Sequence, residues 1–236
     1  MKPSVQTIPF IKLSLTFIPV LIVIGIIWKW GFDYMTHVYA VFRMLLQLLL
    51  IGYLLAFIFK SNSPYIIVII LIVMLSASSW IALRTSKISR KSLYLKTLAA
   101  IFIGGTTVLV LVTQFVLQLH PWYMPSYMIP LAGMIFANAM NAVSLAIERL
   151  EAETDRDVPY DRARIIALRA SLIPITNSLL AVGLVSLPGM MTGQILSGIS
   201  PFIATRYQIM VMCMIFGSAG ISSSCFLIFV RSDFTR

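Results

Sequence analysis

Charged side chains are scarce in this chain. Asp, Glu, Lys and Arg make up 11% of its 236 residues, and hydrophobic residues make up 59%. Soluble domains are nearer ~25% charged and ~45–50% apolar. Such a chain has too few polar side chains to cover a water-facing surface. The composition therefore excludes an ordinary soluble protein and favours an integral membrane protein.

Histidine, a common base and metal ligand, is nearly absent. His37 opens the second apolar stretch and His120 closes the fourth, which places them on opposite faces of ~30 Å of hydrocarbon. No two carboxylates lie within one apolar stretch, and no serine has a histidine base nearby. We therefore expect no catalytic residues, no histidine-based zinc site and no enzyme activity of the chain's own.

Nucleotide-binding motifs are also missing. No GxxxxGK[ST] pattern occurs, so the chain cannot hold a nucleoside triphosphate in that way. We expect no bound cofactor, and any use of ATP would belong to a partner subunit. The net charge of +10 does not indicate nucleic acid, because the basic residues lie between apolar stretches, as membrane topology requires. The lipid bilayer is the expected surrounding.

Cysteine is limited to Cys213 and Cys225. Both fall in the last apolar stretch, 12 positions apart, which corresponds to ~18 Å along a helix. A disulfide requires Cα atoms within ~7 Å. The two thiols therefore cannot pair within one chain.

Seven apolar stretches are present, and each is long enough to cross the membrane as a helix, which takes ~20 residues. They lie at 8–28, 38–59, 64–83, 97–119, 124–147, 173–197 and 207–230. We predict an all-α membrane protein with about seven transmembrane helices. Residues 1–236 would form a single transmembrane domain with short connections.

The basic residues predict the orientation. They concentrate in the first connection, the connection after the third span, the segment 148–172 and the tail after Val230. A seven-span path puts all these segments on one side of the membrane. Because basic loops stay in the cytoplasm, we expect a cytoplasmic carboxyl terminus and an amino terminus outside.

The segment 148–172 also holds most of the acidic residues, in the string ERLEAETDRDVPYDRARIIALR. Mixed charge at this density predicts a hydrated cytoplasmic element, with a helix, a break at Pro159 and a second helix. It is either a solvated loop or a docking surface for a cytoplasmic partner. The candidate docking residues are Glu151, Asp155, Asp161, Arg162, Arg164 and Arg169.

Two spans carry polar side chains in the apolar interior. Arg43 and Gln47 are four residues apart and share a helix face, which either faces protein or lets Arg43 snorkel to the interface. Gln47 lies deeper and favours the protein-facing alternative. Asn138 and Asn141 lie on one stripe of the fifth span, as interhelical hydrogen-bonding groups or as the lining of a substrate path.

The sixth span and its continuation contain Pro188, Gly189, Gly193, Gly198 and Pro201. Proline removes a backbone donor and breaks or kinks a helix, and broken helices mark binding sites in several transporters. The alternative is close helix packing through the GxxxG pattern of Gly189 and Gly193. The candidate transport-path residues are Arg43, Gln47, Asn138, Asn141, Pro188, Gly189, Met190, Met191, Thr192, Gly193 and Gln194. Met190, Met191, Met210 and Cys213 are candidate ligands for a soft metal.

The strings PLAGMIFANAMNAVSLAIERL, LPGMMTGQILSG, RYQIMVM and RMLLQLLLIGYLLAFIF together resemble the FetB-type permeases. This family includes bacterial iron-export permeases and plant relatives linked to aluminium tolerance. The resemblance covers roughly residues 38–230, and PGMMTGQIL is its most specific string.

The resemblance implies the membrane subunit of an ABC transporter in the cell inner membrane, working as a homodimer with a separate ATPase. It implies iron export for bacterial members and a proposed sugar-nucleotide substrate for plant relatives. The alternatives are a permease for another substrate, a passive channel and a membrane scaffold without transport activity.

Overall fold

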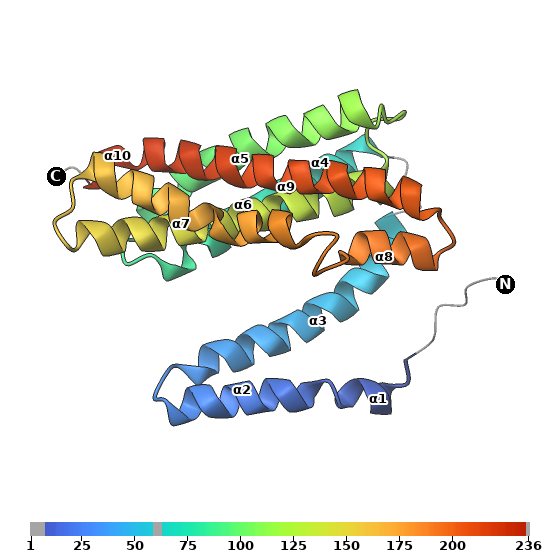
Figure 1. Ribbon diagram of the computed structural model, residues 1–236, viewed down its shortest axis with the longest axis horizontal. Coiled ribbons are helices and arrows are strands. Elements are labelled where there is room, and N and C mark those ends of the chain that lie inside the picture. Colours follow the sequence, from blue (N-terminus) through green and yellow to red (C-terminus); the bar gives the residue numbers. More distant parts are fainter. Residues whose placement is uncertain (1–7, 59–62, 235–236) are drawn as a thin grey trace. The chain divides into compact units, whose positions relative to one another are not determined.

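The computed structural model describes residues 8–58 and 63–234. These residues form helices and their connections, and within the two ranges Val182 and Ser186 form only an isolated bridge. The chain divides into two compact units, Met1–Ser61 and Asn62–Arg236. The all-α architecture predicted from the apolar stretches is confirmed (Figure 1).

The first unit contains α1 (Phe10–Ser14), α2 (Phe17–Lys29) and α3 (Tyr34–Ile58). Asp33 caps α3, because its carboxylate accepts hydrogen bonds from the backbone N–H groups of Met35 and Thr36 and from the Thr36 hydroxyl. The Thr36 hydroxyl bond is the main reason that the pKa of Asp33 lies below its usual value. No residue of α1 or α2 is buried, so their apolar side chains are available to lipid.

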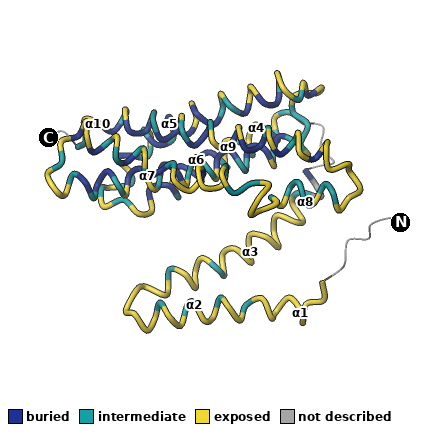
Figure 2. The backbone as a smooth tube through the Cα atoms, viewed as in Figure 1, coloured by how far each residue is buried: buried dark blue, intermediate teal, exposed yellow. Residues whose placement is uncertain are grey.

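The second unit contains the remaining elements. They are α4 (Pro64–Ala82), η1 (Leu83–Thr85), α5 (Arg90–Val110), the π-helical turn η2 (Leu111–Val116), α6 (Pro125–Thr154), α7 (Tyr160–Ala181), α8 (Gly189–Leu196), α9 (Pro201–Phe229) and α10 (Arg231–Phe234). Within this unit α9 packs against α5, α6 and α7, and α6 also packs against α4. Figure 2 shows the buried positions on the inward sides of these helices.

Prolines set several helix starts. Pro64, Pro125 and Pro201 stand in the first turns of α4, α6 and α9, where the missing N–H would have no intrahelical acceptor. Pro159 and Pro188 immediately precede α7 and α8. The break predicted at Pro159 is therefore present, between the end of α6 and the start of α7.

Small residues allow α5 and α9 to cross closely. A Cβ placed on Gly104 would lie 2.3 Å from Ser222 Oγ and 2.7 Å from the Ser222 backbone nitrogen. A Cβ on Gly105 would lie 2.7 Å from the Phe136 ring of α6. Glycine at these two positions is what lets three helices pack at this distance.

Seven helical segments in the described residues are long and apolar enough to cross a membrane: Phe10–Lys29, Tyr34–Leu55, Pro64–Thr85, Arg90–Val116, Pro125–Thr154, Tyr160–Ala181 and Pro201–Phe229. This agrees with the predicted number of spans. The protein is therefore a multi-pass membrane protein with seven apolar helices.

The structure divides the sixth span differently from the expected range 173–197. The long helix α7 begins at Tyr160 and ends at Ala181, and α8 is a separate helix of 8 residues. Pro174 lies inside α7 without ending it, whereas the chain leaves the helical path before Gly183, which has a φ of +82°. The expected charged segment 148–172 consists of the end of α6, a short turn and the first part of α7.

Candidate functional site

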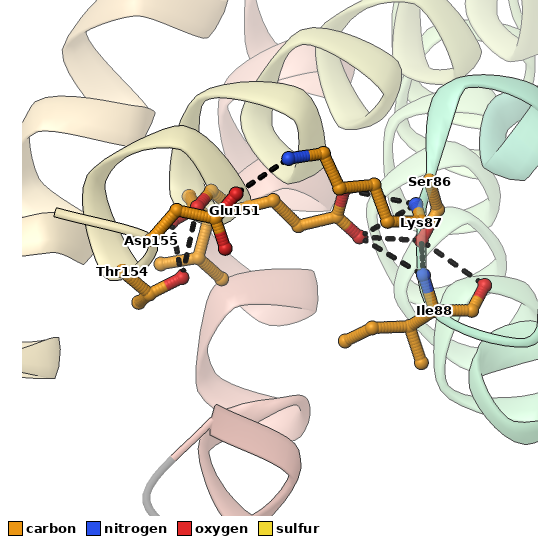
Figure 3. Close-up of polar contacts among 7 residues, drawn as sticks. Ser86, Lys87, Ile88, Glu151, Thr154 and Asp155 are labelled. Carbon is orange, nitrogen blue, oxygen red and sulfur yellow. Dashed lines mark hydrogen bonds and ion pairs between the residues drawn. The ribbon is translucent and has the colours of Figure 1, made fainter. Parts of the chain in front are cut away.

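The charged end of the second unit comprises residues 84–90, 148–164 and 231–234. Its most buried acidic group is Glu151 of α6, which is 4% exposed. The Glu151 carboxylate accepts hydrogen bonds from Ser86 Oγ at 2.6 Å and from the Lys87 backbone N–H at 3.0 Å (Figure 3). Glu151 thereby anchors the connection between η1 and α5 to the end of α6.

Lys87 also reaches Asp155 on the next turn of α6, at an Nζ–Oδ2 distance of 2.5 Å (Figure 3). The hydrogen bond to Asp155, followed by the attraction between the two charges, raises the pKa of Lys87 above its ordinary value. Both side chains are largely exposed. The pair therefore adds a weak, salt-sensitive contact beside the buried Glu151 anchor.

A second set of contacts joins the end of α9 to its neighbours. The Tyr160 hydroxyl at the start of α7 donates a hydrogen bond to the Leu227 carbonyl of α9. Asp161 pairs with Arg164 at 3.1 Å and with Arg231 at 3.5 Å. Lys96 of α5 pairs with Asp233 of α10 at 2.5 Å. The charged end is thus tied together across α5, α6, α7, α9 and α10.

These contacts separate the predicted docking residues into two groups. The carboxylates Glu151, Asp155 and Asp161 have partners within the chain, as does Arg164. Arg162 and Arg169 are exposed on α7, and Ile165, 65% exposed, lies between them. The spacing 162, 165 and 169 puts these side chains on one helix face. These three residues, the α7 ridge, form an exposed face of the charged segment that could receive a partner.

The opposite end of the second unit is loosely built. Between Ala181 and Pro188 the chain is irregular, and the eight residues of α8 include none that is buried. A Cβ on Gly189 or Gly193 would meet nothing within 4 Å. The alternative interpretation, close helix packing through these glycines, is therefore not seen within the second unit.

A cavity of about 400 Å³ lies at this loose end, between α6, α8 and α9. Its lining includes Met134 and Tyr127 of α6, Met190 and Gln194 of α8, and Tyr207 of α9. Gln194 Oε1 is buried and accepts no hydrogen bond from any described residue. The Gln194 side chain thus borders a mostly apolar pocket, while its Oε1 atom does not face the open space.

The other predicted path residues lie elsewhere. Asn138 donates a hydrogen bond to the Met134 carbonyl of its own helix, at 2.8 Å, and Asn141 is exposed. Neither asparagine lines the cavity. Within the first unit, Arg43 and Gln47 are exposed on α3. Thr192 bonds to the Pro188 carbonyl at 3.2 Å and stabilises the first turn of α8.

The predicted soft-metal ligands are only partly brought together. Met190 and Met210 line the same cavity, whereas Met191 and Cys213 do not. Both cysteines are free thiols, as their helical separation predicted. Among the described residues no group of three His, Cys, Asp or Glu side chains is placed to hold a metal ion.

Two features were missed at the level of sequence. The Glu151 anchor joins residues about 65 positions apart, and no local pattern announces such a contact. The cavity had a weak signal in the sequence. Half of its lining residues come from two sets of positions at helical spacing, which are 127, 131 and 134 on α6 and 203, 207 and 210 on α9. Such stripes ordinarily pack in a core, so they could not be assigned to a cavity without the position of α8.

Comparison with known proteins identifies related sequences. The family described as Uncharacterised protein family (UPF0014) matches residues 10–159 and 153–235. The UPF0014 membrane protein slr1647 of Synechocystis is 38% identical over 193 residues, which are 73% of this chain and 73% of that protein. The Probable iron export permease protein FetB of Escherichia coli is 33% identical over 207 residues, covering 80% of this chain and 78% of the relative.

A plant relative is similar over a comparable length. The protein ALUMINUM SENSITIVE 3 of Arabidopsis thaliana is 34% identical over 205 residues, which are 79% of this chain and 72% of that protein. No solved structure matches the chain. The family matches extend over nearly all the membrane helices, and they agree with the resemblance found in the sequence strings. The chain belongs to the UPF0014 family of membrane proteins.

Proposed function

We propose that the chain is the membrane-spanning permease subunit of an ABC-type exporter in the cell inner membrane. Two copies would pair and work with a separate cytoplasmic ATPase. The cargo we propose is iron, with a role in metal homeostasis and protection from oxidative stress. The observation that carries the proposal is the similarity over 80% of the chain to a protein named as a probable iron export permease.

The chain's own chemistry supports a transport subunit rather than an enzyme. It has no Walker A pattern, so the energy for export would come from ATP bound by a partner. The candidate transport path is the loose end of the second unit, where α8 interrupts the membrane helices and borders a cavity. Irregular backbone at membrane depth is tolerated where protein or a water-filled cavity covers it.

The α7 ridge supports docking of an ATPase. Arg162 and Arg169 flank the exposed Ile165, which offers a partner two cations and an apolar contact on one face. Behind the ridge, Tyr160 and Asp161 bind the ends of α9 and α10. A force applied to the ridge would therefore pass to α9, which also borders the cavity.

Co-purification tests the ATPase assignment. The chain would be co-expressed with a Walker A protein from a neighbouring reading frame, purified in detergent and reconstituted in lipid. We expect the ATPase to remain bound and its turnover to rise in the presence of the permease. Loss of the ATPase during gentle purification, with no change in turnover, would contradict the proposal.

Charge reversal on the α7 ridge locates the docking surface. Arg162→Glu combined with Arg169→Glu should reduce ATPase retention about tenfold, because two favourable charge contacts become repulsive. Arg206→Glu is the matched control, since Arg206 is also exposed but lies at the opposite end of the unit. Equal retention by both variants would mean that the ATPase docks elsewhere.

Cysteine labelling tests the orientation, with Cys213 and Cys225 first replaced by serine or alanine. Single cysteines at 88 and 156 should react only after the cytoplasmic side is opened, and one at 122 should react from outside. Labelling of residue 156 from outside would overturn the proposed topology. Uptake of radioactive iron into inverted vesicles then tests the cargo directly.

A further inference from the structure

Three methionines meet at the cavity from three different helices. Met134 comes from α6, Met190 from α8 and Met210 from α9, and each is half-buried. Helices that are far apart in sequence thus bring thioethers to one enclosed space. Thioether sulfur is a weak, soft ligand that favours soft ions such as Cu(I).

The rest of the lining argues against a hard or highly charged ion. Among the described residues that line the cavity there is no Asp, Glu, His or Cys. A ferrous ion prefers carboxylate and imidazole ligands, and none is offered here. Thioethers carry no charge, and a buried cation without a balancing anion costs more as its charge increases. A soft monovalent ion fits this lining better than a divalent one.

Polar groups at the cavity are few. The Gln194 side chain borders the cavity, but its Oε1 atom is fully buried and does not face the open space. The phenols of Tyr127 and Tyr207 lie at the same cavity.

The size of the cavity and the loose packing of α8 allow an ion to enter. About 400 Å³ exceeds one ion and leaves room for waters that it carries, since a water takes ~30 Å³ of liquid volume. No residue of α8 is buried, and its two glycines face open space. Small adjustments of α8 and of the flexible methionine side chains can therefore bring the three sulfurs together.

We propose that Met134, Met190 and Met210 form a binding site for a soft monovalent metal ion of the Cu(I) or Ag(I) class. This ion is distinct from the iron cargo proposed above, so the site goes beyond the proposed function and does not rest on it. Binding itself requires neither the ATPase nor transport. The two proposals can therefore fail separately.

Silver titration of the purified full chain, with Cys213 and Cys225 replaced by serine, tests the site, because free thiols would bind Ag⁺ more tightly than thioethers. Ag⁺ is the probe because it does not change oxidation state, and binding is measured by calorimetry in chloride-free detergent buffer. We expect saturable binding, and we expect M134L/M190L/M210L in the same background to lose it, because leucine offers no sulfur ligand. The control M35L/M44L/M191L removes three thioethers outside the cavity, two of them exposed on α3, and should bind Ag⁺ as the parent chain does.

Two further measurements keep the result decisive. Met190→Leu alone, on the lightly packed α8, should weaken Ag⁺ binding while thermal unfolding is unchanged, which separates ligand loss from misfolding. X-ray absorption of the silver complex should show a sulfur shell that the triple cavity variant lacks.

Absence of saturable binding, or equal loss in the cavity and control variants, would overturn the proposal. Displacement of Ag⁺ by equimolar Fe(II) would also overturn it, while supporting iron as cargo.

Discussion

The two ends of the second unit differ in how strongly polar contacts tie their helices together. At the charged end, Glu151 accepts several hydrogen bonds while buried, and Asp161 pairs with cations from two helices. At the loose end, α8 has no buried residue and Gln194 Oε1 has no partner among the described residues. The same long helices, α6 and α9, run from one end to the other.

This difference suggests that the two ends of the bundle serve different functions. A surface that receives force from a docked partner must be stiff, and buried hydrogen-bonded networks provide stiffness. A site that admits and releases a ligand must open at little cost, and segments with few buried contacts do so. The contrast predicts that equivalent substitutions at the two ends have unequal effects on stability.

The largest effect is expected at Glu151. Glu151→Ala removes the carboxylate that accepts hydrogen bonds from Ser86 Oγ and the Lys87 backbone N–H. Both donors then lack this acceptor. We expect unfolding to become easier by about 3 kcal/mol, because hydrogen bonds to a buried charged group are lost and two part-buried donors lose their acceptor. Denaturant unfolding in detergent measures this change.

Two variants sharpen the Glu151 prediction. Glu151→Gln keeps one oxygen acceptor and should lose less stability than the alanine variant. Glu148→Ala lies one turn earlier on the exposed side of α6 and should stay within about 0.5 kcal/mol of the parent. If Glu148→Ala and Glu151→Ala were equally destabilising, the anchoring role of Glu151 would be wrong.

A smaller contrast is expected between glycines. Gly104→Ala places a Cβ 2.7 Å from the Ser222 backbone nitrogen, which can yield only if α5 and α9 separate, and should cost about 2 kcal/mol. Gly193→Ala meets nothing within 4 Å and should gain up to about 1 kcal/mol from better helix propensity. Thermal unfolding of the two variants gives the comparison, and a destabilised Gly193→Ala would show that α8 is packed more tightly than we describe.

The helices were predictable because membrane crossing demands long apolar stretches, which can be read locally in the sequence. The basic residues between these stretches are also local signals, and they predict the orientation of the chain. The break near Pro159 followed from proline chemistry. The boundary of the sixth helix did not follow from proline chemistry, because Pro174 lies inside α7 without ending it and the chain leaves the helix at 182–188 instead. The Glu151 anchor and the meeting of Met134, Met190 and Met210 depend on how distant helices pack. No single-helix pattern contains that information.

The smallest effect is expected for the Lys87–Asp155 pair, whose side chains are 72% and 56% exposed. The pair raises the pKa of Lys87 above its ordinary value of 10.5. A raised pKa means that the contribution of Lys87 to stability is fully present below pH 10.5 and is lost as the pH rises through the higher folded-state pKa. The parent chain should therefore exceed Lys87→Met in stability by a small, constant amount from neutral pH to about 10.5, and the difference should close above that.

Raising salt from about 0.15 M to 1 M should shrink the difference, since the screening length falls from ~8 Å to ~3 Å. The backbone N–H of residue 87 still bonds to Glu151 in the variant, so the comparison isolates the side chain. A difference that persists at high pH and high salt would mean that Lys87 stabilises the connection by packing rather than by charge.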